Sequence, residues 1–413
     1  MYPGYNQEKR ELLLPGEFTS ATQVAPAYRW MLAGLLAMSL LFAAQRASAQ
    51  MDYSATDGRT HAINTAVPFL RITPDARRAA LGDAGIALSP DANSVFFNLS
   101  QIPFAAAEKG VSASFTPWLR SMTSDVYLGD ISAYKKLDEN QAVGVGFRYF
   151  NLGSVQLADF QGNDQGNVRP GEFSLDAGYA RKLNTHWSVG VAFRYIHSKL
   201  ASGAKAGGVG SYKAGNAFAG DISTTYTSVK EYDGDQKGTW RFGAVLSNIG
   251  TKISYSTDSQ DKYFLPANLG IGGGYTYQLD AKNALTLTLD INKLMAPTPD
   301  TVDGNKDGVP DFRQKGILSG TFGSFGDAPG GMKEELHELM YSTGLEYTYG
   351  DLLALRAGYY NEHKTKGNRK YLTAGVGLKY KMAGLDFSYL VPAGGDPLHP
   401  LANTLRITLS ATW

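Results

Sequence analysis

The sequence predicts an all-β protein, a transmembrane antiparallel β-barrel of about fourteen strands. Three observations indicate this fold class. Short segments of alternating polar and apolar residues recur from about residue 110 onward. Short and long connections alternate between these segments, and the final segment ends in an aromatic residue.

The alternating segments would form the barrel wall. Leu285, Leu287 and Leu289 are separated by threonines, and the same period of two recurs in the other segments. Successive side chains of a strand point to opposite faces, so one face would meet lipid and the other a polar lumen. A soluble β-sandwich shows the same alternation. The expected strands are residues 110–117, 124–137, 140–150, 171–183, 186–199, 216–231, 238–250, 263–279, 283–295, 338–349, 352–361, 369–381, 384–391 and 400–413.

The lengths of the connections favour the barrel over the sandwich. Short turns such as residues 138–140 and 184–185 alternate with long loops. Outer-membrane barrels have short periplasmic turns and long extracellular loops. If the first strand starts from the periplasm, every long loop is extracellular. The long loops are residues 151–170, 200–215, 251–262 and 296–337.

The final segment alternates Leu405, Ile407 and Leu409 with polar residues and ends on Trp413. An amphipathic strand that ends in an aromatic residue resembles the signal recognised when barrels insert into the outer membrane. Together with the loop lengths, this strand indicates an integral protein of the bacterial outer membrane.

The composition excludes several other classes of protein. The mean hydropathy of −0.23 is too low for a helical membrane protein, because each span needs about 20 apolar residues. The net charge of +1 gives no reason to expect nucleic acid as a partner. The chain has no cysteine, which excludes disulfides, thiolate zinc sites and cysteine nucleophiles. No Ser/His/Asp or paired-acid arrangement indicates catalysis, so we do not expect the protein to be an enzyme.

Two segments precede the predicted barrel of residues 110–413. Residues 1–49 are predicted to be a signal peptide with a long N-terminal region, because an apolar run from Met31 ends in Ala47-Ser48-Ala49. Residues 50–109 contain four prolines and do not alternate. We expect them to form a plug in the lumen, since a barrel of this size is too wide for its own side chains to fill. A loosely ordered periplasmic tail is the alternative.

The expected plug carries a distinctive sequence. Its runs Thr65–Arg77, Leu81–Ala87 and Ser89–Ser94 resemble the opening of the PorV family, outer-membrane proteins of the type IX secretion system within the FadL-like (fatty-acid-transporter) barrels. One departure is Phe97-Asn98-Leu99-Ser100, where the family usually has Trp-Asn-Pro-Ala. Loss of the proline, which fixes φ, is expected to loosen that turn. The similarity continues through residues 115–119, 142–153, 172–183 and 192–200.

The resemblance implies a role in protein transport. Members of the family bind the C-terminal domain of secreted cargo at the type IX translocon barrel. They shuttle the cargo to the surface sortase, or attachment, complex. The barrel type alone also allows the alternative of a FadL-like transporter of fatty acids or other hydrophobic compounds. An apolar lumen with a lateral opening would favour the role of a transporter. A polar, plugged lumen would favour the role of a cargo shuttle. Outer-membrane lipid is a further expected partner.

A calcium loop is the one metal site that the sequence suggests. Oxygen ligands at alternate positions, followed by a glycine that permits a sharp turn, are what calcium requires. The twelfth position is Gln314, without the bidentate glutamate of an EF-hand, so weak binding of the extracellular type is expected. A glycine-rich turn without an ion is the alternative. The candidate ligands are Asp303, Asn305, Asp307 and Asp311.

The same loop is the candidate partner site. Apolar residues exposed on a loop often mark an interaction surface, although these residues could equally fold back over the barrel mouth. The candidate residues are Phe312, Ile317, Leu318, Phe322 and Phe325.

The lumenal face of the expected strands carries arginines, which burial would require to be paired. We expect Arg148, Arg194, Arg241 and Arg356 to pair with Asp176, Glu346 and Asp386.

Overall fold

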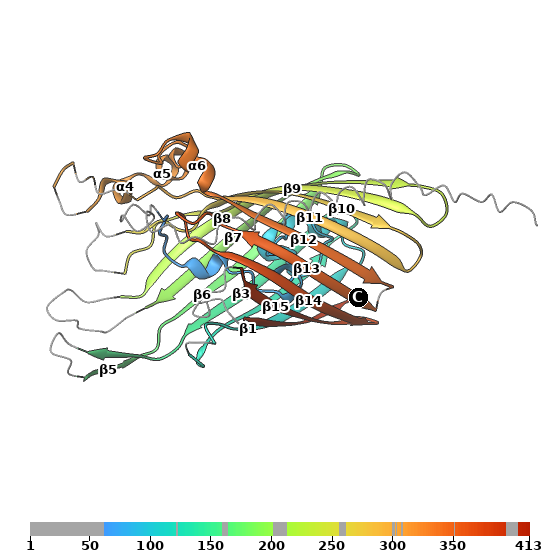
Figure 1. Cartoon of the computed structure of the whole chain (residues 1–413), viewed down its shortest axis with the longest axis horizontal. Coiled ribbons are helices and arrows are strands. Elements are labelled where there is room, and N and C mark those ends of the chain that lie inside the picture. The colour runs from blue at the N-terminus through green and yellow to red at the C-terminus, as the bar shows by residue number, and fades with distance from the viewer. Residues whose placement is uncertain are drawn as a thin grey trace, which may run out of the picture. The chain divides into compact units, whose positions relative to one another are not determined.

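The computed structural model is a closed antiparallel barrel (Figure 1). It describes residues 62–413 except 121–122, 159–163, 201–212, 256–261, 300–301, 303, 307–308, 351 and 394–403. The predicted signal peptide and the start of the predicted plug lie outside the described residues. No described helix is long and apolar enough to cross a membrane.

Fourteen strands form the wall, the number that the alternation predicts. Strands β4 (Val155–Ala158) and β5 (Asp164–Val168) form a separate hairpin in the first long loop. The first and last wall strands pair, with Gly110 opposite Thr412, and close the barrel. The wall strands are β1 (Lys109–Pro117), β2 (Val126–Lys136), β3 (Gln141–Leu152), β6 (Gly171–Lys182), β7 (Trp187–Lys199), β8 (Gly215–Glu231), β9 (Lys237–Gly250), β10 (Asn268–Gln278), β11 (Asn283–Leu294), β12 (Leu339–Tyr349), β13 (Leu353–Asn361), β14 (Lys370–Tyr380), β15 (Ala383–Pro392) and β16 (Leu405–Thr412).

The wall strands present apolar residues outward. In β3, Val145 and Phe147 are exposed. Gly146, which lies between them, and Arg148, which follows them, are buried. The alternation continues around the barrel, as a lipid-facing surface with a polar interior requires.

The two ends of the barrel differ (Figure 1). At one end lie the long loops and three short helices, α4 (Asp311–Gln314), α5 (Ile317–Gly323) and α6 (Met332–His337). We call this the long-loop end. The other, the short-turn end, contains tight connections such as the one at Asp138, whose carboxylate accepts hydrogen bonds from the backbone N–H groups of Asn140 and Gln141 at 2.7 and 2.8 Å. Such side-chain bonds replace backbone partners in a turn.

The segment before β1 lies inside the barrel. It forms η3 (Pro68–Arg71), α2 (Ala76–Ala79), α3 (Ser94–Phe97) and η4 (Leu99–Phe104). Helix α2 packs against β14, β15 and β16, whereas η4 packs against β6, β7 and β8. These strands belong to different sides of the wall, so the segment, which we call the plug, occupies the lumen.

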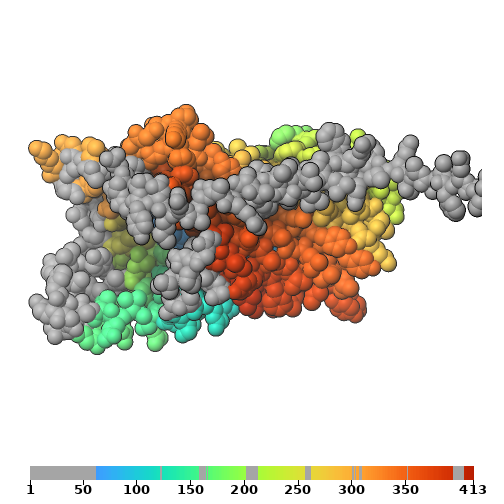
Figure 2. Space-filling view, viewed as in Figure 1, coloured from blue at the N-terminus to red at the C-terminus, as the bar shows by residue number. Residues whose placement is uncertain are grey.

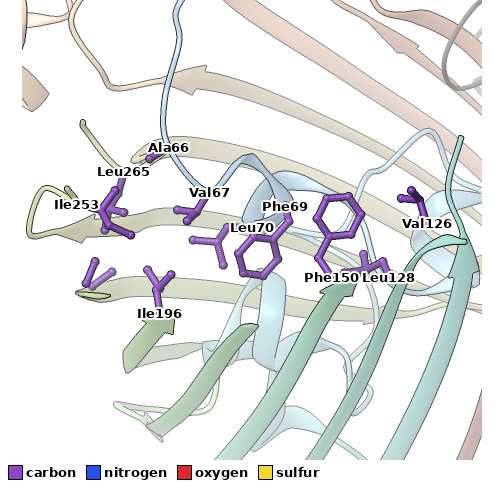
Figure 3. Packing of buried hydrophobic residues seen from close by; sticks show 12 residues of the cluster. Ala66, Val67, Phe69, Leu70, Val126, Leu128, Phe150, Ile196, Ile253 and Leu265 are labelled. Carbon is purple, nitrogen blue, oxygen red and sulfur yellow. The ribbon is translucent and has the colours of Figure 1, made fainter. Parts of the chain in front are cut away.

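An apolar cluster fixes the plug near the long-loop end (Figure 3). Phe69 and Leu70 of η3 pack among inward residues of the wall, including Phe150 and Ile196. The Phe69 and Phe150 rings stack with centroids 6.3 Å apart. Burying one such side chain contributes about 1.5–3 kcal/mol, so this cluster is a substantial part of the docking free energy.

Glycines in the wall let the plug approach the strands. A Cβ added at Gly274 of β10 would lie 2.5 Å from the carbonyl oxygen of Ala87, closer than two such atoms can come. The glycine-rich run of residues 270–274 is therefore a strand that accommodates the plug backbone.

The turn at Leu99 is held by contacts other than a proline. The Asn98 side chain donates to the carbonyl of Ile86 at 2.9 Å, and the Ser100 hydroxyl donates to Asn98 Oδ1 at 2.5 Å. Leu99 itself packs over Gly178 of the wall. These hydrogen bonds and this packing are the contacts that hold the turn in the absence of a proline.

Candidate functional site

A shared carboxylate ties the plug to the wall. Arg77 of α2 donates to both carboxylate oxygens of Glu346 on β12, at 3.0 and 2.9 Å. Arg356 on β13 donates to the same Glu346 at 2.6 Å and to Asp386 on β15 at 2.5 Å. Two guanidinium groups thus hold one carboxylate across the boundary between plug and wall. The predicted pairing of Arg356 is confirmed.

The plug has its own buried ion pairs, which the sequence analysis missed. Asp75 caps α2 by accepting from the backbone N–H of Arg78 at 2.9 Å. The fully buried Arg78 side chain donates to Asp91 at 2.9 Å and to Ser94 at 3.1 Å. Adjacent acidic and basic residues in a segment expected to be buried are the signal that could have revealed this network.

The other lumenal arginines divide into two cases. Arg194 pairs with Asp176, as predicted, and also with Asp221 at 3.0 Å. Arg241 donates to the hydroxyl of Thr276 at 3.2 Å and forms no ion pair with a described carboxylate, so the prediction is wrong for this residue.

The prediction is also wrong for Arg148. Its guanidinium donates to the plug carbonyl of Leu70 at 3.0 Å and lies over the Phe96 ring, 4.1 Å from the centroid. The plug supplies a carbonyl and an aromatic face in place of a carboxylate. The pattern along the strands cannot reveal such partners.

The helices α4–α6 form a cap at the long-loop end, visible in Figure 2 as the orange part of that end. Large apolar side chains are exposed on it, Leu318 at 63% and Met332 at 72%. We call the exposed apolar residues the cap patch, and they are Leu318, Phe322, Phe325, Met332 and Leu336.

Buried ion pairs anchor the cap to the barrel. Lys293 at the end of β11 donates to Glu335 at 2.9 Å and also pairs with Glu338. Lys366 in the loop between β13 and β14 donates to Glu338 at 3.0 Å and to Glu334 at 2.7 Å. Since both lysines and Glu338 are buried, losing one partner would leave an uncompensated charge. Helix α6 is therefore held in place although its apolar residues Met332 and Leu336 are exposed.

Two histidines stack where the cap meets the β13–β14 loop. The rings of His337 and His363 lie with centroids 3.6 Å apart and planes 9° from parallel. Burial, then the neighbouring His337, lowers the pKa of His363. The surroundings of His363 therefore favour its uncharged form.

The structure brings three of the predicted partner-binding residues together on the cap. Leu318 and Phe322 lie one turn apart on α5, and Phe325 follows it; all three are exposed. Phe312 on α4 and Ile317 are half-buried. The sequence analysis missed Met332 and Leu336 of the patch, and the available signal was their apolar character within the same long loop.

Half of the predicted calcium loop can be placed. Asp303 and Asp307 lie outside the described residues. The backbone N–H of Gly304 donates to the Asp311 carboxylate at 3.2 and 3.3 Å, and Asn305 donates to Gln314 at 3.2 Å. The described part of the chain contains no group of three or more histidine, aspartate or glutamate side chains that could hold a metal. Calcium at this loop stays a prediction.

Several solved structures are similar to the chain. The Pseudomonas putida toluene transporter TodX is 10% identical with a TM-score of 0.48, covering 82% of this chain and 98% of its own. The Ralstonia pickettii toluene transporter TbuX is 12% identical with a TM-score of 0.46 and the same coverage. A Pseudomonas aeruginosa FadL homologue is 9% identical with a TM-score of 0.40, covering 83% of this chain and 98% of its own. No curated protein matches the chain.

A family model gives the identification. The model described as "Type IX secretion system protein PorV" matches residues 54–301, more than half of the 413-residue chain. The match includes the whole described plug and the wall from β1 to β11. The chain therefore belongs to the PorV family and is an outer-membrane β-barrel component of the type IX secretion system.

Proposed function

We propose that this protein binds the C-terminal domain of secreted cargo at the type IX translocon and shuttles the cargo to the surface sortase complex. In this proposal the long-loop end faces the outside of the cell. The barrel contacts its partners and catalyses no reaction.

The cap patch is the observation that carries the proposal. Exposed apolar groups gathered on one surface favour contact with another protein. Buried ion pairs of Glu335 and Glu338 hold α6, which carries Met332 and Leu336 of the patch. On the other side of the patch, Lys252 donates to the carbonyls of Arg313 and Lys315 just before α5, at 2.6 and 2.5 Å. An anchored surface loses less conformational entropy on binding than a mobile loop does.

The polar lumen favours the shuttle over the alternative of a transporter for hydrophobic compounds. The plug occupies the lumen, and its contact with the wall includes the charges of Arg77, Glu346 and Arg356. A hydrophobic compound passing there would have to displace paired, desolvated ions, at considerable cost. Even 16–18-stranded porins leave only an aqueous channel, so folded cargo would be handled at the outer surface.

The direct test replaces apolar residues of the patch by charged ones. The double variant Leu318→Asp with Phe322→Asp is expected to abolish cargo export while the barrel still inserts. Ser319→Asp is the control, because it adds a negative charge at an exposed position of the same helix without removing an apolar side chain. Export is read from surface-attached cargo, and insertion from heat-dependent mobility of the barrel on gels. Normal export by the double variant would exclude the patch as the contact.

A second test identifies the partners. Native affinity purification of the wild-type protein is expected to recover the translocon barrel and surface proteins that share a C-terminal domain. The double variant should lose one or both. Recovery of neither by the wild-type protein would contradict the shuttle.

A further inference from the structure

A cavity of about 370 Å³ lies between the plug and the wall at the long-loop end. Its lining includes Asn64, Thr65 and Arg71 from the plug side and Met340, Lys366 and Arg369 from the wall side. One buried water needs roughly 10–15 Å³ of such space, so the cavity can hold a small hydrated group.

Arg71 lacks an anionic partner in this cavity. Its Nη2 donates to the sulfur of Met340 at 2.7 Å, and it forms no ion pair with any carboxylate that the structure describes. A thioether is a weak acceptor. The Nη2 atom of Arg369 lies 4.0 Å from the same sulfur. Two guanidinium groups therefore converge on one uncharged atom.

The other charges around the cavity are already paired. Arg369 donates to the two carboxylate oxygens of Glu362 at 2.7 and 3.0 Å. Lys366 is paired with Glu334 and Glu338. Three cations (Arg71, Lys366 and Arg369) and two carboxylates (Glu338 and Glu362) line the cavity. Arg71 is the cation that has no carboxylate partner among them. Burial, followed by the charge of Arg369, lowers the pKa of the Arg71 guanidinium, as expected for a cation that lacks its own counter-ion.

A second cavity, of about 120 Å³, lies deeper in the lumen and shares Arg71, Met340 and Arg369 with the first. Carboxylates of Asp83 and Asp290 line only this inner cavity. Arg148 also lines the inner cavity, so both cavities contain three cations and two carboxylates, and the three shared residues form the boundary between them.

We propose that the outer cavity binds an oxyanion, the carboxylate or phosphate group of a ligand, through the guanidinium groups of Arg71 and Arg369. A guanidinium presents two parallel N–H donors that match both kinds of group. Arg71 can turn from the Met340 sulfur to the oxyanion and exchange a weak acceptor for a strong, charged one. Asn64 and Thr65 add polar groups at the rim. The proposal is independent of the cargo-binding role.

Calorimetric titration of the purified full-length protein in detergent tests the site, with inorganic phosphate and acetate as separate probes. Saturable binding of at least one probe is expected. Arg71→Gln should weaken it about tenfold or more, since charge-assisted hydrogen bonds are lost, and Arg71→Lys should restore part of the affinity. Lys199→Gln is the matched control, because it removes an exposed cation at the same end of the barrel and should leave binding unchanged.

The two probes distinguish the sources of the anionic group. Tighter binding of phosphate indicates a phosphorylated ligand, and tighter binding of acetate indicates a carboxylate; either result supports the site when Arg71→Gln weakens it. Saturation by neither probe, or equal affinity of the Arg71→Gln and wild-type proteins, would overturn the proposal. Heat-dependent gel mobility of each variant shows that the barrel is folded in every comparison.

Discussion

Glu346 occupies a central place among the lumenal charges. It accepts hydrogen bonds from an arginine of the plug and from an arginine of the wall, and its side chain is only 5% exposed. Desolvated charges are costly unless every one is paired. The three side chains therefore stabilise the docked plug together, and none of them can be replaced without leaving another charge with fewer partners.

Replacing Arg77 by alanine is expected to loosen the plug by on the order of 3–5 kcal/mol, because Glu346 and Asp91 would each lose a buried donor. Proteolysis of residues 62–105 in the inserted barrel should become faster. Arg181→Ala, which removes an exposed arginine from β6, is the control. Its plug should be cleaved at the same rate as that of the wild-type protein. Equal protection of the Arg77 variant would show that the apolar cluster alone holds the plug.

The stacked histidines predict a dependence of the cap on pH. Burial, then His337, lowers the pKa of His363, so the folded protein binds fewer protons there than the unfolded chain. The stability that the neutral His363 ring contributes is complete above about pH 6.5 and decreases as the pH falls below that value. Hydrogen exchange in residues 332–338, corrected for its intrinsic rate, should therefore be faster at about pH 5 than at about pH 7.5. His363→Gln should remove most of this difference; an unchanged difference would assign the effect to other groups.

At the scale of elements, the strands could be predicted because each carries its own period of two. Their ends could not be predicted as well. The strand expected from residue 263 begins at Asn268, because Pro266 cannot donate to the ladder and Tyr263 forms an isolated bridge with Ile253 instead.

The cap helices could not be predicted, since helices of four to seven residues carry almost no periodic signal. Their stability comes from contacts with distant residues. Lys293 and Glu338 are 45 positions apart in the sequence, and Glu338 and Lys366 are 28 apart. The apolar residues Leu318 and Phe322 were visible in the sequence, but the ion pairs that anchor α6 were not.

The loop before α4 is predicted to bind calcium weakly, at roughly 10⁻⁴–10⁻³ M. Adding calcium should protect residues 302–311 from proteolysis, because ligation by Asp303, Asn305, Asp307 and Asp311 would fix the backbone. Asp307→Asn should reduce this protection, and magnesium at the same concentration is the control, since it favours small octahedral sites. Absence of protection up to several millimolar calcium would leave a glycine-rich turn without an ion.

At the scale of the whole molecule, the plug should make the barrel a poor pore. Fourteen strands enclose a lumen wider than their own side chains can fill, and the plug occupies it. The wild-type protein in a planar bilayer is expected to show little steady conductance, whereas deletion of residues 62–105 should open a stable pore. Heat-dependent mobility would show that the shortened barrel has inserted. Equal conductance of the two proteins would mean that the plug does not seal the lumen.

The pairing of β1 with β16 constrains the order of assembly. The plug precedes β1 in the chain and contacts strands from β2 to β16. A ring that had already closed would have to admit this whole segment through one end, past the side chains that it finally contacts. We expect the wall instead to form around the plug while its first and last strands are still apart. The seam, where Lys109 and Trp413 exchange two backbone hydrogen bonds of 3.0 Å, would then close last and enclose the plug permanently.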